Sequence, residues 1–137
     1  MTTLTEFIAA RLDEDEASAT AAADSGRWYI DVDGNVQDED THGGGSAYVA
    51  VGPWDGGIDD ACAAHIVRHD PARVLREVDA KRKILTEIVP LVDSMDSWIQ
   101  ESMGAHDAPP LGESEALLRI LAAAWSDHPD YDQGWRP

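Results

Sequence analysis

The sequence predicts a mostly helical α+β fold, with about four helices around a long kinked helix at 71–103 and a small antiparallel β element at about 27–51. Three observations predict this class. A long stretch carries apolar residues at helical spacing, a helix-start signal stands directly before it, and a short stretch of alternating apolar and polar residues runs into a turn. At 137 residues, the chain is expected to form a single domain.

The first helix is predicted from residues that recur at intervals of four. Leu4, Ile8 and Leu12 would lie on one face of a helix that begins with Thr5 as its cap and ends near Ala23.

The β element follows this helix. Apolar and polar residues alternate over 28–32, and residues 33–35, Asp-Gly-Asn, form a turn that predicts a hairpin. A second strand is expected at 47–51. The glycine-rich segments 37–46 and 52–57 are expected to be flexible loops.

The long helix is the centre of the predicted fold, and a short helix over 58–69 precedes it. Pro90 lacks a backbone N–H, so a kink is expected at 86–90. A last helix is expected at 113–126. The buried face of the long helix is predicted to consist of Val74, Val78, Leu85, Ile88, Val92, Met95 and Ile99, with Lys81 as the polar exception. Ile84, Leu91 and Trp98 are expected to widen this face, so that the second half of the helix is buried on two sides.

The charge is strongly negative and uneven. The net charge is −17, and residues 1–60 hold 14 acidic against two basic residues, a balance of −12. A basic stretch over 68–83 is expected to pair with acids of the first half, including the run over 13–16. Direct binding to nucleic acid or to an anionic membrane is not expected, because phosphate contacts need a basic surface.

The single cysteine, Cys62, permits no internal disulfide, which fits a reducing compartment. No apolar run approaches the roughly 20 residues that span a bilayer, and no signal peptide is recognisable. A cytoplasmic protein is therefore expected.

The segment around the start of the long helix combines histidines with charged residues. Asp70 is expected to cap the helix, with Pro71 at its first position, and Arg73 and Arg76 are expected to pair with acids. No metal or other cofactor is expected. The alternative is a metal-dependent enzyme, because His65 and His69 share a helix face, and His128 or Asp70 would supply a third ligand.

The C-terminal tail carries a second cluster. His128 and Pro129 follow the last helix and are expected to be structural. Tyr131 and Trp135 are expected to cover the end of the core as an aromatic clasp. The alternative is a partner-binding surface made of Tyr131, Trp135 and Arg136, since exposed aromatic and arginine residues dominate interface energetics.

These segments together resemble a family of small actinobacterial and actinophage proteins of unknown function. The resemblance rests on residues 6–16, on the His-Asp-Pro-Ala-Arg helix within 65–83, on 117–122 and on the His-Pro-Asp-Tyr tail at 128–131 with Trp135-Arg136. It implies a phage or prophage origin, but no activity, cofactor or catalytic residue.

The functional prediction is a small acidic interaction or regulatory protein that binds a host or phage protein. This prediction rests on the negative charge, on the aromatic residues at the ends of the chain and on the absence of a convincing catalytic set. A nucleic-acid mimic is a special case, because a compact body of charge −17 would compete for basic DNA-binding surfaces.

Overall fold

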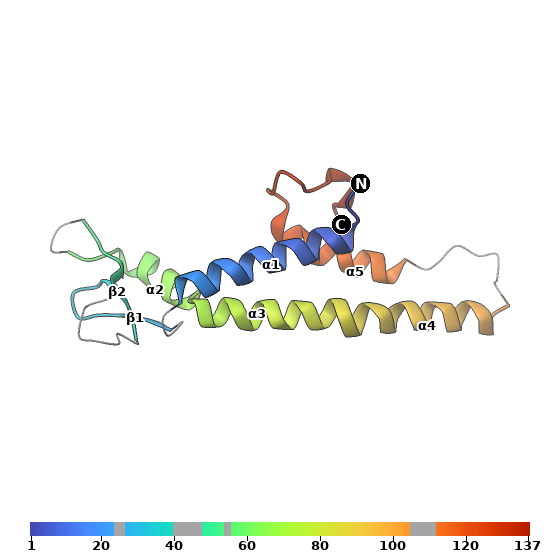
Figure 1. Cartoon of the computed structure of the whole chain (residues 1–137), viewed down its shortest axis with the longest axis horizontal. Helices are drawn as coiled ribbons and strands as arrows, with labels where there is room; N and C mark the ends of the chain where they lie inside the picture. The colour runs from blue at the N-terminus through green and yellow to red at the C-terminus, as the bar shows by residue number, and fades with distance from the viewer. Residues whose placement is uncertain (24–26, 40–47, 54–55, 105–111) are drawn as a thin grey trace. The chain divides into compact units, whose positions relative to one another are not determined.

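The computed structural model describes residues 1–23, 27–39, 48–53, 56–104 and 112–137 (Figure 1). The predicted class, a mostly helical α+β fold with a small antiparallel sheet, is confirmed. The chain divides into two compact units. One comprises Met1–Asp13 with Asp79–Pro137, and the other comprises Glu14–Val78.

Helix α1 spans Leu4–Ala22, and its cap differs from the prediction. The Glu6 carboxylate accepts hydrogen bonds from the Thr3 N–H and hydroxyl, while the Thr3 hydroxyl accepts from the Glu6 N–H. This is a capping box, so Thr3 rather than Thr5 starts the helix. Phe7, Ile8 and Leu12 are almost fully buried and form the core contribution of the first half of α1.

The sheet has three antiparallel strands, β1 (Trp28–Ile30), β2 (Val36–Asp38) and β3 (Tyr48–Ala50), in the order β1-β2-β3. The predicted hairpin is confirmed, since Trp28 pairs with Asp38 and Ile30 with Val36. Residues 37 and 38 were expected to begin a flexible loop, but they belong to β2, the central strand of the sheet. The remainder of that loop lies mostly outside the described residues, as does part of 52–57.

The hairpin turn is fixed by one carboxylate. Asp31 accepts hydrogen bonds from the backbone N–H groups of Asp33 and Asn35, at 2.9 Å each, and from the Gln37 side chain. Gly34 supplies the positive φ of 78° that the turn requires. The hydrogen bond from Asn35 is the main reason why the pKa of Asp31 lies below its ordinary value.

We therefore expect the Asp31 carboxyl to titrate below the unfolded value of about 3.9. Its hydrogen bonds stabilise the hairpin above that unfolded value, and this contribution is lost as the pH falls through the lower folded pKa. Carbon-detected NMR titration of the side-chain carboxyl measures the midpoint, and Asp31→Asn removes the titration. A midpoint at or above the unfolded value would contradict the assignment.

The predicted short helix is α2 (Asp60–Arg68), which packs against β1 and β2. Asp59 caps it by accepting from the N–H groups of Ala61 and Cys62. Helix α3 (Pro71–Lys83) follows, and Asp70 accepts from the Arg73 N–H at 2.7 Å, as a cap does.

At the position of the predicted kink the structure has a π-helical turn, Ile84–Ile88, which separates α3 from α4 (Val89–Ser102). The Val89 N–H donates to the carbonyl of Ile84, five residues earlier. Pro90 follows directly, and it lacks the N–H that an uninterrupted α-helix would use. Helix α5 (Glu113–Ala122) lies alongside α4 (Figure 1) and continues as a 3₁₀ turn, Ala123–Trp125.

Candidate functional site

The tail folds onto the start of α1 through an aromatic cluster. The ring of Phe7 lies 5.9 Å from that of His128, 5.8 Å from that of Tyr131 and 5.1 Å from that of Trp135, measured between centroids. Tyr131 and Trp135 also meet edge to face at 5.8 Å. Such tilted pairs add stability beyond the area that they bury.

The three residues of the predicted partner-binding surface differ in their exposure to solvent. Tyr131 is only 5% exposed and Trp135 is half-buried, whereas Arg136 is exposed. Their arrangement favours the aromatic clasp over a binding surface centred on Tyr131.

His128 is held by Arg11, a residue 117 positions away in the sequence. Arg11 is buried and donates to His128 Nδ1 at 2.9 Å, and its guanidinium lies 5.2 Å from the Phe7 ring. The Asp130 N–H also donates to that nitrogen, at 3.1 Å. Because Nδ1 accepts from both groups, it is not available as a metal ligand in this arrangement. Pro129 sets the direction of the chain between these residues.

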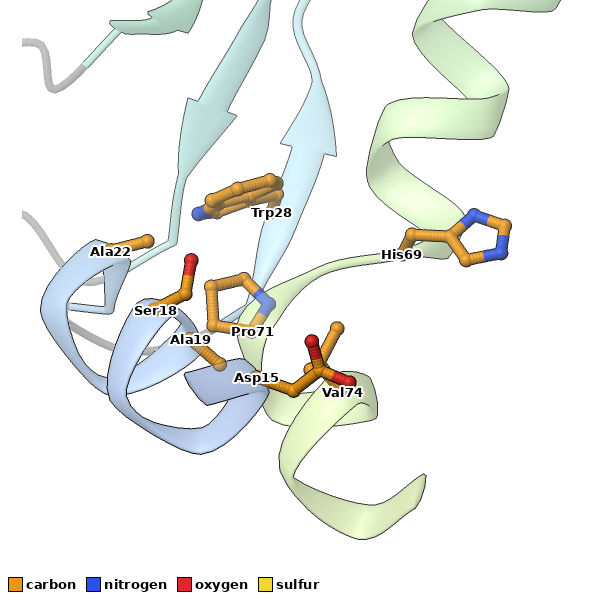
Figure 2. Close-up of a pocket in the computed structure, with 8 residues that line it drawn as sticks. All are labelled: Asp15, Ser18, Ala19, Ala22, Trp28, His69, Pro71 and Val74. Carbon is orange, nitrogen blue, oxygen red and sulfur yellow. The ribbon is translucent and has the colours of Figure 1, made fainter. Parts of the chain in front are cut away.

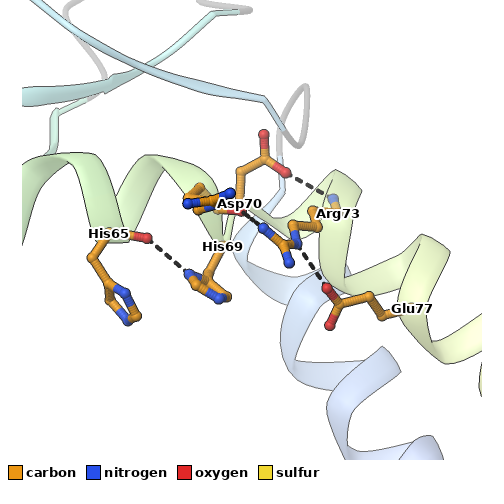
Figure 3. Close-up of polar contacts among 6 residues, drawn as sticks. His65, His69, Asp70, Arg73 and Glu77 are labelled. Carbon is orange, nitrogen blue, oxygen red and sulfur yellow. Dashed lines mark hydrogen bonds and ion pairs between the residues drawn. The ribbon is translucent and has the colours of Figure 1, made fainter.

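The second predicted segment forms the corner between α2 and α3 (Figure 3). Arg73 donates to the carbonyl of Arg68 at 3.1 Å and to the Glu77 carboxylate at 2.7 Å. It thereby satisfies a carbonyl at the end of α2 while lying on α3. Arg76 is exposed on the same helix. Arg82, another residue of the basic stretch, donates to the carboxylate of Asp13 in the acidic run. The pairing predicted for Arg73 and Arg76 with that run stays a prediction.

The two histidines of the corner lie together. Their ring centroids are 4.4 Å apart, and His69 Nδ1 donates to the carbonyl of His65 at 2.9 Å. His128 belongs to the other compact unit. Among the described residues, no three His, Cys, Asp or Glu side chains are grouped so that they could hold a metal ion.

A pocket of about 260 Å³ lies beside this corner (Figure 2). Ala19, Ala22, Trp28, Pro71 and Val74 give it a mostly apolar lining, and Asp15 and Ser18 add oxygen atoms.

The tryptophan of this pocket is fixed by a hydrogen bond. Trp28 Nε1 donates to the Asp38 carboxylate at 3.2 Å. The imidazole of His69 points away from the other lining side chains (Figure 2). No described hydrogen bond joins it to Asp15 or Ser18, so this pocket has no described acid–base pair.

An exposed apolar surface begins at Ile88, the last residue of the π-helical turn, and runs along α4. We call it the α4 stripe and define it as Ile88, Leu91, Met95 and Trp98, which are 44%, 54%, 55% and 68% exposed. Their spacing of three, four and three residues places them on one side of a helix.

The α4 stripe corrects part of the predicted core. All four residues of the stripe were expected to be buried, Ile88 and Met95 on the main apolar face and Leu91 and Trp98 beside it, but the buried positions of α4 are Val89 and Asp96. A π-helical turn holds one more residue than an α-helical turn, so the residues after it are rotated by about 100°. Periodicity identified the apolar residues correctly, but the sequence pattern gave no sign of this rotation.

A family model for a family of unknown function, DUF6221, matches residues 1–137. The chain belongs to this family. No curated protein and no solved structure matches the chain. Membership in DUF6221 confirms the resemblance to a family of unknown function and assigns no site residue. Among the described residues of this DUF6221 member, no helix is both long enough and apolar enough to cross a membrane.

Proposed function

We propose that this DUF6221 member is a non-enzymatic, cytoplasmic interaction protein of phage or prophage type, which binds a host or phage protein through the α4 stripe. The observation that carries the proposal is the exposure of four large apolar side chains along one helix face. Scattered exposed apolar residues need no explanation, but a continuous row is typical of an interaction site.

The spacing of the α4 stripe fits a helical partner. Apolar residues that alternate at three and four positions form the seam along which two helices pack. An amphipathic helix laid along the stripe would bury its own apolar face against Leu91, Met95 and Trp98.

The acidic residues beside the stripe indicate which charge a partner helix should carry. Residues 84–102 contain four acids and no lysine or arginine. Glu87 and Glu101 are exposed, and they lie four residues before Leu91 and three after Trp98, so both border the stripe. The partner helix is therefore one with basic edges. A second copy of this chain would bring like charges together, which opposes pairing through the same surface.

The experiment uses the full chain and two synthetic amphipathic peptides of about 18 residues, roughly five helical turns. Both have the same leucine face, and one has lysine edges while the other has glutamate edges. Isothermal titration should detect binding of the lysine peptide. The double variant Leu91→Ser, Met95→Ser should weaken it at least tenfold, because the apolar contact is lost while the net charge stays the same.

The matched control is the double variant Val32→Ser, Val51→Ser, since both valines are exposed outside α4. Its affinity for the lysine peptide should equal that of the unmodified chain. Equal binding by the stripe variant would show attraction by charge alone and would defeat the proposal. A dimer detected by sedimentation that dissociates in the stripe variant would identify a second copy as the occupant.

A further inference from the structure

A pocket of about 430 Å³ lies where α4 packs against α5, apart from the α4 stripe. Its polar lining comes from Asp93, Asp96, Ser97 and Gln100 of α4 and from Ser114 and Glu115 of α5. No lysine or arginine side chain lines it among the described residues. Pockets of this size hold small molecules rather than single ions.

Asp96 is the unusual member of this lining. It is only 7% exposed, and no described hydrogen bond or ion pair reaches its carboxylate. A carboxylate that is mostly buried and has no partner loses much of its contact with water, which costs free energy. A cation bound in the pocket would pair with this carboxylate and offset that cost.

The neighbouring charges indicate more than one positive group on the ligand. Asp93 is three residues before Asp96 on the same side of α4, so both carboxylates face one region. Glu115 is already paired with Arg119, at 2.7 Å. The carboxylates of Asp93 and Asp96 therefore have no lysine or arginine partner in the pocket lining, and each can pair with one ammonium group.

The geometry also separates an organic cation from a metal ion. Among the described residues, no three carboxylate, histidine or cysteine side chains are grouped so that they could hold a metal ion. The hydroxyl oxygens of Ser97 and Ser114 can accept hydrogen bonds from ammonium groups. We infer that the pocket between α4 and α5 binds a linear aliphatic polyamine, with ammonium groups paired to Asp93 and Asp96. This inference is independent of the proposed function.

Isothermal titration of the full chain with spermidine is the test, with n-butylamine and MgCl₂ as separate arms. Spermidine should bind at one site per chain, at least tenfold more tightly than butylamine. Asp96→Asn should weaken spermidine binding at least tenfold. The matched control, Asp127→Asn, removes the same charge from an exposed aspartate outside the pocket and should leave the affinity unchanged.

Thermal melts give a second readout and show that the variants fold. Spermidine should raise the melting temperature of the unmodified chain and of Asp127→Asn, but not of Asp96→Asn, because a ligand stabilises the state that it binds. Equal losses in both variants would mean diffuse attraction to an acidic protein and would overturn the inference. So would butylamine binding as tightly as spermidine, Mg²⁺ binding that depends on Asp96, or the absence of saturable binding.

Discussion

Replacing Phe7 with alanine should lower the free energy of unfolding by about 3–5 kcal/mol, the usual cost of truncating a buried aromatic residue. Phe7 is only 1% exposed, and its ring contacts those of Tyr131 and Trp135 as well as the guanidinium of Arg11. The substitution would leave a cavity between α1 and the tail. The cost of such a substitution depends on how far the surrounding side chains can move to fill the cavity.

Urea denaturation followed by circular dichroism measures this loss. Trp98→Ala is the control, because Trp98 is 68% exposed and its truncation should change stability by no more than about 0.5 kcal/mol. Phe7→Leu keeps an apolar side chain and should cost less than Phe7→Ala. Equal losses for Phe7→Ala and Trp98→Ala would mean that the aromatic cluster is not a core.

The features that sequence reasoning predicted well are local. The cap at Asp70, the hairpin turn after β1 and the start of α5 depend on residues within four positions of one another. Such signals act through the backbone hydrogen bonds of a single turn. The capping box at Thr3 is of the same kind, and the spacing Thr3-x-x-Glu6 could have identified it.

Other features depend on more than local pattern. Strand β2 has three residues, and the glycines that follow it made the whole segment resemble a loop. Its Val36 is fully buried in the central strand of a sheet against which α2 packs, and a single short segment does not reveal this environment.

The candidate surfaces illustrate the same limit at longer range. The residues of the α4 stripe were recognised as apolar, but the π-helical turn decides which of them face outward. The contact between Arg11 and His128 joins residues 117 positions apart. Asp96 has the sequence context of an ordinary helical acid, yet it is buried on α4, the helix that packs against α5. Tertiary packing, which periodicity does not encode, sets all three.

Replacing Tyr131 should give opposite results for two substitutions. Tyr131→Ala should cost about 3–5 kcal/mol, because the side chain is 5% exposed and packs against Phe7 and Trp135. Tyr131→Phe should instead raise stability by about 1 kcal/mol, since a buried polar group without a partner carries a desolvation cost. The Tyr131 hydroxyl is buried and has no hydrogen-bond partner among the described residues.

Thermal melts and urea denaturation of the two variants measure both effects, and a double-mutant cycle with Phe7→Ala separates the contact from the burial. The rings of Phe7 and Tyr131 touch edge to face, so the two alanine substitutions should be non-additive by about 0.5–1.5 kcal/mol. If Tyr131→Ala left stability unchanged while peptide binding was lost, the tail would be a partner-binding site and the aromatic clasp would be wrong. If Tyr131→Phe were as destabilising as Tyr131→Ala, the hydroxyl would have a partner, and the desolvation argument would fail.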